Sequence, residues 1–285
     1  MPNVKQDKIQ KYTSMKINIL RILLLCTVTI FGQEFQGKAV YKTHRKIDLK
    51  LGNDSKGLNP AMQKQIQTRL TNQFQKTFIL NFNKSESLYK EDNQLLFPQE
   101  GSGGVDLQVI GNGGGTDILY KNTINKRFSR KTEIGGKNFL IQDNLEDYGW
   151  KLSGESKNIG KYTCYKATRI VEITLLSSNT KDTEEDNKEK VTMETIAWYT
   201  PEIPISNGPD MFWGLPGLIL EIQEGKLKIV CTEIVLNSKK RIEIKEPRKG
   251  KKVTQLKFNN ITQEYQKDMM ERLKNTRNSN VWIID

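Results

Sequence analysis

The side chains that most often carry catalysis or bind metals are scarce in this sequence. It holds a single histidine, His44, and three cysteines, Cys26, Cys164 and Cys231. A nucleophile–histidine pair would have to use His44, which lies in a basic stretch that is more typical of a surface histidine. A zinc site needs more histidine and cysteine ligands than the chain offers. The sequence therefore predicts neither a nucleophilic triad nor a metal site, and it implies no cofactor.

Carboxylates are the remaining groups that could do chemistry. The run at residues 184–186 is charged and is most simply a hydrated loop. Asp143 and Asp147 could form the carboxylate pair that glycoside hydrolysis uses, but only if the fold brought them together. Acid–base catalysis needs positioned titratable groups, and the sequence locates none. A carboxylate-using hydrolase therefore stays an alternative, and an enzyme is not what we expect.

Cys164 and Cys231 each lie in a stretch that reads as a β-strand. An oxidising compartment permits a disulfide between them, and an even pair of cysteines fits one. Two buried free thiols are the other interpretation, because cysteine is a common core residue. Spacing alone does not bring the two within bonding reach.

Turn-forming residues dominate the middle of residues 198–222, which we call the signature. The turn candidates are Gly208, Pro209, Gly214, Pro216 and Gly217. Pro216 followed by Gly217 predicts a type II turn, which needs a positive φ at the glycine. Strand alternation follows, and Glu224-Gly225 predicts a hairpin. A second interpretation makes the apolar side chains of the loop a ligand-binding or partner-binding rim, formed by Met211, Phe212, Trp213, Leu215 and Pro216.

The signature, with its run Gly-Leu-Pro-Gly-Leu-Ile at residues 214–219, resembles that of the GLPGLI family of secreted bacterial proteins. The resemblance implies export and a β-rich fold, but no agreed biochemical role. Such proteins look similar in layout to the lipoprotein-carrier (LolA-like) fold, a curled antiparallel sheet over a helix. That second likeness is architectural and carries little functional weight.

The N-terminus has the pattern of a secretory signal peptide. Lys16 and Arg21 precede the apolar run at residues 22–31, and cleavage after Gly32 would leave Gln33 first. Met15 is a natural start within a longer extension. We therefore divide the chain into a leader, residues 1–32, and one β-rich domain, residues 33–285. The apolar run is too short for a typical membrane anchor, so the processed protein is not expected to be integral to a membrane.

Removing residues 1–32 leaves 40 basic and 32 acidic side chains, a net charge of +8. Basic residues cluster at residues 239–245 and 248–252. These clusters are typical of solvated strands and turns, and they could also favour an anionic surface such as lipopolysaccharide. Nucleic acid is not an expected partner, because the sequence has no nucleic-acid-binding motif.

Alternating apolar residues separated by short turns predict a mainly β fold of the α+β class, with antiparallel pairing. The expected form is a curled sheet or unclosed barrel packed on one or two helices. The predicted strands span residues 35–46, 76–82, 87–90, 117–122, 127–133, 137–143, 162–175, 191–199, 218–223, 226–235 and 253–258.

Two helices are predicted from apolar residues that recur every fourth position. The first begins at Pro60 and the second near Asn260, with its stripe at Ile261, Tyr265, Met269 and Leu273. Three segments read as loops or turns, at residues 98–115, 153–160 and 179–190. The chain ends in an apolar tail, residues 281–284, that is expected to dock or to add a strand.

Together these features favour an exported, non-catalytic protein of the bacterial envelope, periplasmic or extracellular. The expected activity is binding of an apolar or amphipathic ligand in a concave face, or of an envelope partner. An accessory protein of an outer-membrane receptor is a further alternative.

Overall fold

The computed structural model describes residues 15, 35–45, 75–92, 117–177 and 187–275. The chain divides into two units, Met1–Phe35 and Gln36–Asp285, and the fold belongs to the second. Its elements, in chain order, are β1 (Gln36–Arg45), β2 (Thr77–Asn83), β3 (Glu86–Glu91), β4 (Ile118–Asn122), β5 (Arg127–Ile134), β6 (Lys137–Asn144), β7 (Lys151–Ile159), β8 (Tyr162–Ser177), β9 (Asn187–Thr200), β10 (Leu218–Glu224), β11 (Leu227–Leu236), β12 (Lys251–Val253) and α3 (Gln255–Asn275).

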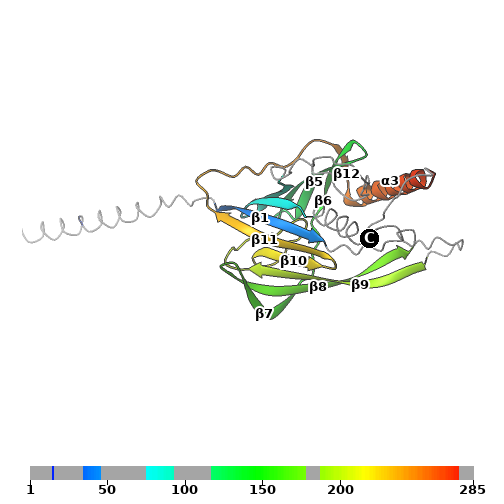
Figure 1. Cartoon of the computed structure of the whole chain (residues 1–285). Helices are drawn as coiled ribbons and strands as arrows, with labels where there is room; N and C mark the ends of the chain where they lie inside the picture. The colour runs from blue at the N-terminus through cyan, green and yellow to red at the C-terminus, as the bar shows by residue number, and fades with distance from the viewer. Residues whose placement is uncertain (1–14, 16–34, 46–74, 93–116, 178–186, 276–285) are drawn as a thin grey trace, which may run out of the picture. The chain divides into compact units, whose positions relative to one another are not determined.

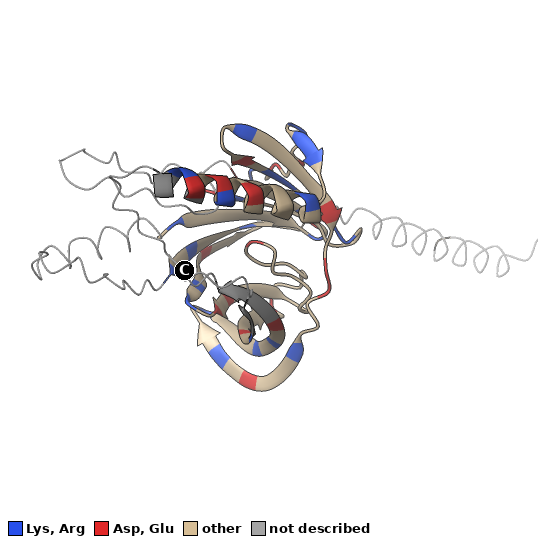
Figure 2. Ribbon diagram, turned by 90° about the vertical axis from the view of Figure 1, so that its right-hand side faces the viewer, with Lys and Arg blue, Asp and Glu red and all other residues tan. Residues whose placement is uncertain are grey.

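All twelve strands belong to one sheet, in the order β12-β6-β5-β4-β3-β2-β1-β11-β10-β9-β8-β7. Every pairing is antiparallel except β12 with β6, which is parallel. The sheet curls, so that its two halves face each other, but it does not close (Figures 1 and 2). The predicted fold class, a curled, unclosed and mainly antiparallel sheet with a helix, is confirmed.

Alternation along the strands separates a buried inner face from an outer face. On the inner face lie Tyr41, Leu80, Tyr89 and Leu119, which follow one another across neighbouring strands and are all at least nine-tenths buried. Tyr41 donates a hydrogen bond from its hydroxyl to the carbonyl of Ile219 at 2.8 Å. The core therefore sits inside the curl and ties β1 to β10.

Two predicted boundaries are wrong. Residues 153–160 were expected to be a turn, yet β7 spans Lys151–Ile159 and forms an edge of the sheet. Its alternation is weak because the pairing with β8 slips between Leu152 and Ser156 and because this strand has no fully buried side chain. The last predicted strand, residues 253–258, is wrong in most of its length. Only Val253 belongs to a strand, as the last residue of β12, and α3 begins at Gln255.

Helix α3 begins at Gln255, five residues before the predicted start. Phe258 packs on Phe139 of β6, with 5.6 Å between ring centroids. Of the predicted stripe, Tyr265 is 41% exposed, so the stripe is only partly covered by the described residues. Figure 2 shows basic and acidic residues side by side along the helix.

Several predictions fall on residues outside the described part of the chain. They are the leader, the first helix, the glycine-rich segment at residues 98–115, the acidic run at residues 184–186 and the apolar tail. Residues 187–190 of the predicted charged loop belong to β9, which pairs with β8 from Ser177↔Asn187 onward. Among the described residues, none of the helices has the length and apolar character needed to cross a membrane.

Candidate functional site: the signature loop inside the curled sheet

Residues 201–217, which we call the signature loop, connect β9 to β10, and several of their side chains lie in the core. The exposed fractions of Ile203, Ile205 and Leu215 are 0%, 2% and 1%, and Phe212 and Trp213 are also buried. The backbone of the loop accepts hydrogen bonds from β10. The amide of Leu218 donates to the carbonyl of Ile203, and the amide of Ile219 donates to the carbonyl of Asn207, each at 3.0 Å. The loop therefore contributes buried side chains to the core and is hydrogen-bonded to β10.

This burial corrects the expectation of an apolar binding rim. Phe212, Trp213 and Leu215 are core side chains, so they cannot form an exposed rim. Pro216 is exposed and Met211 is half-buried, and these two remain accessible at the surface. An interior position for such large apolar groups follows from the area that each removes from water.

The turn chemistry at Gly217 also differs from the prediction. Positive φ occurs at Gly214, at 95°, and not at Gly217, so the predicted type II turn is wrong. The amide of Gly217 donates instead to the carbonyl of Leu215 at 2.8 Å, which makes a tight turn centred on Pro216. Gly217 is required for another reason: a Cβ there would overlap the carbonyl oxygen of Thr200 and lie 2.6 Å from its carbonyl carbon.

Gly208 has a similar role in close packing. A Cβ at this position would lie 2.8 Å from the Cβ of Ile219 and 3.1 Å from the carbonyl oxygen of Phe212. Its φ is not positive, so close packing and not backbone conformation makes a side chain costly. At Gly208 and at Gly217 a side chain would therefore collide with neighbouring atoms.

A buried lysine holds the signature loop against the other half of the sheet. Lys121 of β4 has no exposed surface. Its Nζ donates to the carbonyls of Gly208, Asp210 and Phe212, at 2.8, 2.5 and 3.0 Å. Three carbonyl acceptors match the three N–H donors of an ammonium group, so the buried charge is fully hydrogen-bonded. No donor is left over for a ligand.

Burial lowers the pKa of Lys121 to about 7, while Asp210 raises it and Arg130 lowers it further. In the unfolded chain the same group titrates near pH ~10.4. Between these values the unfolded state binds more protons, so stability rises with pH across this window. The contribution is lost as the pH falls towards about 7, and it does not change further below that pH because both states are then protonated.

We therefore expect the difference in unfolding free energy between the wild type and Lys121→Met to grow with pH. The growth should approach about 1.4 kcal/mol per pH unit between about pH 7.5 and pH 8.5. Urea titrations of both proteins across this range measure it. Taking the difference removes the titrations that the two proteins share, such as those of the thiols. A constant difference would show that Lys121 keeps an ordinary pKa.

Asp210 links the signature loop to β5. Its carboxylate accepts from the Arg130 guanidinium at 2.6 Å, and its φ of 45° is unusual for a residue other than glycine. Its charge also acts on a second carboxyl group. Burial raises the pKa of Asp117, and Asp210 adds to this rise, while a hydrogen bond from Thr132 and the charge of Arg130 oppose it. Oδ1 of Asp117 is buried and has no hydrogen-bond partner among the described residues.

Two tryptophans fix the connection between β6 and β7 onto the signature loop. Nε1 of Trp150 donates to the carbonyl of Trp213 at 2.8 Å, and Nε1 of Trp213 donates to the carbonyl of Glu146 at 2.9 Å. Tyr148 stacks on Trp150, with ring centroids 5.3 Å apart. The Arg169 guanidinium lies 4.5 Å from the centroid of the Tyr148 ring. The loop is thus held from three sides, by β4, by β5 and by the connection between β6 and β7.

The carboxylates considered in the sequence, Asp143 and Asp147, have local structural roles. Asp143 accepts from the amide of Gln255 at 3.0 Å and so caps the start of α3. Asp147 accepts from the amide of Gly149 at 3.0 Å within a turn. Among the described residues, no three histidine, cysteine, aspartate or glutamate side chains group in a way that could hold a metal ion.

Cys164 and Cys231 are both buried free thiols, so the suggested disulfide is not formed. Burial raises the pKa of Cys164 to about 11 and that of Cys231 to about 12. Both thiols are therefore protonated at neutral pH, which makes them poor nucleophiles.

We expect neither thiol of the folded protein to react appreciably with a disulfide reagent at about pH 8, because reaction needs an exposed thiolate. Both should react at once after denaturation in guanidinium. The number of reagent thiols released by the folded and by the denatured protein, residues 33–285, measures how many cysteines react in each state. Fast labelling of the folded protein, or no labelling after denaturation, would contradict buried free thiols.

Sequence reasoning missed Lys121, Arg130 and Asp210. One signal was present in the sequence. Lys121 is two residues after Leu119 in the same strand, so the two side chains are on the same, inner face of the sheet. A lysine in an apolar row predicts either a buried partner or a break in the strand. The partner could not be identified, because it is the backbone of a loop about ninety residues away.

A family model described as a protein of unknown function (Porph_ging) matches residues 150–221. This range runs from the end of the connection between β6 and β7, through β7, β8, β9 and the signature loop, into β10. No curated protein matches the sequence.

Two solved structures are similar to the chain, both of PNGF-II, in the C2 and P21 space groups. Their TM-scores are 0.46 and 0.47, with 13% and 12% sequence identity. In each case the alignment covers 81% of this chain and 33% of PNGF-II, so the chain spans about a third of that protein's length.

Proposed function

We propose that this chain is an exported, non-catalytic binding protein of the bacterial envelope and a member of the GLPGLI family. The leader-like pattern of residues 16–32 supports export, and the signature at residues 198–222 supports the family. In this proposal the signature shapes the backbone and the core, and it performs no reaction.

The observation that carries the proposal is that the signature loop buries its apolar side chains in the core of the fold. Ile203, Ile205 and Leu215 are almost fully buried, so their surface is not offered to an apolar ligand. Lys121, which has the chemistry of a nucleophile, is buried and bonded to three carbonyls of the same loop. We therefore assign binding to the outer surface and to an envelope component. An accessory role beside an outer-membrane receptor is one form of this proposal.

Native mass spectrometry of the protein purified from the periplasm of a Gram-negative host tests the proposal. The expected species begins at Gln33 and carries no lipid after a wash at about 1 M salt, which screens contacts with exposed charges. A stoichiometric lipid that survives this wash would indicate an enclosed apolar site and would contradict binding through the outer surface. Recovery of the uncleaved chain from the cytoplasm would contradict export.

One observation favours a second candidate, the carboxylate-using hydrolase. Burial raises the pKa of Asp117, and the charge of Asp210 raises it further. Asp210 itself forms an ion pair with Arg130. Carboxyl groups whose environments differ in this way can divide acid and base roles. Hydrolysis of chromogenic glycosides that is lost in Asp117→Asn, with unchanged thermal stability, would support this candidate. Equal rates for the wild type and the variant would remove it.

A further inference from the structure

Basic side chains concentrate on one segment of the outer surface. Between residues 237 and 252 the sequence has eight basic side chains and two acidic ones. This segment therefore contributes +6 of the net +8 expected for residues 33–285. It consists of residues 237–250, which we call the strap and which connect β11 to β12, and of the first two residues of β12.

The strap is fixed to the sheet through its backbone and through Glu246. The side chain of Gln36 accepts from the amide of Ile242 at 2.9 Å and donates to the carbonyl of Ser238 at 3.1 Å. The Glu246 carboxylate accepts from Arg127 at 2.6 and 3.0 Å and from Ser129 at 2.5 Å. The strap is thus an ordered surface element.

Both acidic side chains of the strap are already paired with basic side chains of this protein. Glu246 is bonded to β5, and Glu243 forms an ion pair with Lys245. Five lysines of the segment are exposed and form no ion pair with any described residue: Lys239, Lys240, Lys249, Lys251 and Lys252. Their charges are therefore available to a partner.

We propose that the strap and β12 form a basic surface that docks the protein on an anionic membrane surface bearing phosphate head groups. The inference rests on the proposed function, since export brings the chain to the envelope. Lysine is a flexible point charge suited to a diffuse anionic surface, and each lysine near such a surface contributes roughly a fivefold gain in affinity. No aromatic residue occurs between residues 237 and 252, so the segment lacks the stacking groups of a single-strand nucleic-acid site.

Sedimentation with lipid vesicles tests the inference on residues 33–285. The vesicles contain either phosphatidylcholine alone or phosphatidylcholine with phosphatidylglycerol. The wild type should bind the mixed vesicles only, and binding should weaken steeply between about 0.15 M and about 1 M salt, as the Debye length falls from roughly 8 Å to roughly 3 Å. The variant with the five exposed lysines changed to glutamine should bind at least about a hundredfold more weakly.

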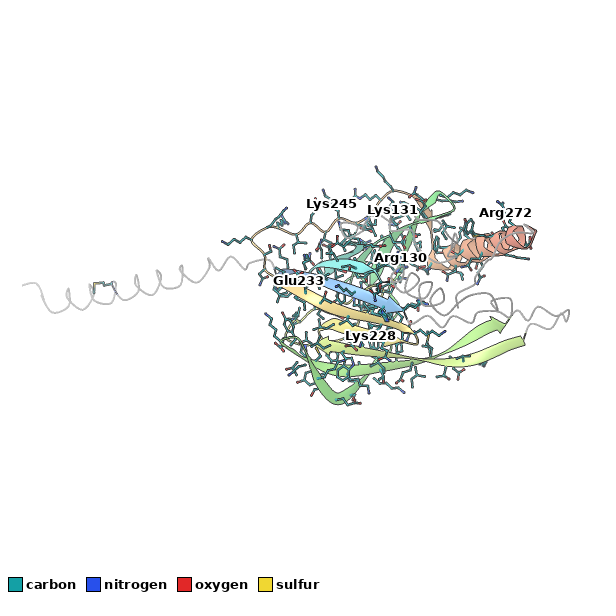
Figure 3. All side chains as sticks on the ribbon, viewed as in Figure 1. Arg130, Lys131, Lys228, Glu233, Lys245 and Arg272 are labelled. Atoms are coloured by element: carbon teal, nitrogen blue, oxygen red, sulfur yellow. The ribbon has the colours of Figure 1, made fainter. Side chains whose placement is uncertain are left out.

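A variant with the same loss of charge elsewhere is the control. It changes five exposed lysines outside the strap to glutamine, none of which forms an ion pair with a described residue: Lys42, Lys90, Lys151, Lys161 and Lys190. Figure 3 shows Lys245 on the strap, along the top of the view. The control should keep vesicle binding within a few fold of the wild type.

Three results would overturn the inference. They are equal binding to both vesicle types, equal loss in the two variants, and tighter binding to a DNA duplex than to the mixed vesicles at the same salt. All ten lysines are exposed, so the two variants should unfold at the same temperature as the wild type. Thermal unfolding of the samples used for sedimentation therefore shows whether a loss of binding is a loss of folding. Export is measured separately by cell fractionation, so a negative vesicle result counts against this inference alone.

Discussion

Replacing Lys121 by methionine is expected to lower the free energy of unfolding by about 3 kcal/mol or more. The variant leaves the carbonyls of Gly208, Asp210 and Phe212 without their common donor. Each buried acceptor without a donor costs about 1–3 kcal/mol. Removing the buried ammonium recovers part of this cost, because a desolvated charge is itself unfavourable. Urea titration of the wild type and the variant measures the difference.

Lys90→Met is the matched control for this substitution. Lys90 lies on β3, beside β4, and is exposed on the outer face. The same change of charge and volume should therefore alter stability by less than about 0.5 kcal/mol. Equal effects of the two substitutions, or a Lys121→Met protein as stable as the wild type, would show that Lys121 does not hold the signature loop.

Gly217→Ala should destabilise the fold by at least about 3 kcal/mol, or prevent it from forming. The added methyl group would overlap the carbonyl oxygen of Thr200 and would lie 2.9 Å from the backbone nitrogen of Pro201. Both obstacles are backbone atoms between β9 and the signature loop, so no side-chain rotation relieves them. Overpacking of a rigid site costs about 1–3 kcal/mol and more when backbone must move. Thermal and urea unfolding of the purified variant measure the effect.

Gly154→Ala serves as the control, in the edge strand β7. A Cβ at this position would meet no atom within 4 Å, and its φ is not positive. The substitution should therefore be neutral or stabilise the protein by up to about 1 kcal/mol, because alanine restricts the unfolded chain. A tolerated Gly217→Ala substitution would mean that β9 and the turn at Pro216 do not approach as closely as described.

The strand pattern could be predicted because it depends on local alternation. The strand around Phe78, Leu80 and Phe82 alternates inside and outside, and β2 follows it at Thr77–Asn83. The reversal after Glu224 was equally local, since Gly225 has the positive φ of 53° that a two-residue hairpin needs. Edge strands give weaker signals, and β7 was missed because neither of its faces is buried.

The candidate site could not be predicted in the same way, because its contacts join distant parts of the chain. Phe212 and Trp213 have the composition of a binding rim, and only the curl of the sheet decides that they are covered. The requirement for Gly217 likewise depends on the approach of Thr200 and not on its own φ. Lys121 looks like a solvated strand lysine until its three carbonyl partners are known.

Backbone hydrogen exchange over residues 203–219 tests most directly whether the signature loop is part of the folded core. The amides of Leu218 and Ile219 donate within the loop and the sheet, and the side chains around them are buried. Exchange followed by mass spectrometry should show protection in this segment comparable to that of β10. Lys121→Met should lower that protection, and Lys90→Met should leave it unchanged. Exchange in wild-type protein as fast as in an unfolded peptide would contradict a structural role and would reopen the inner face of the sheet to a ligand.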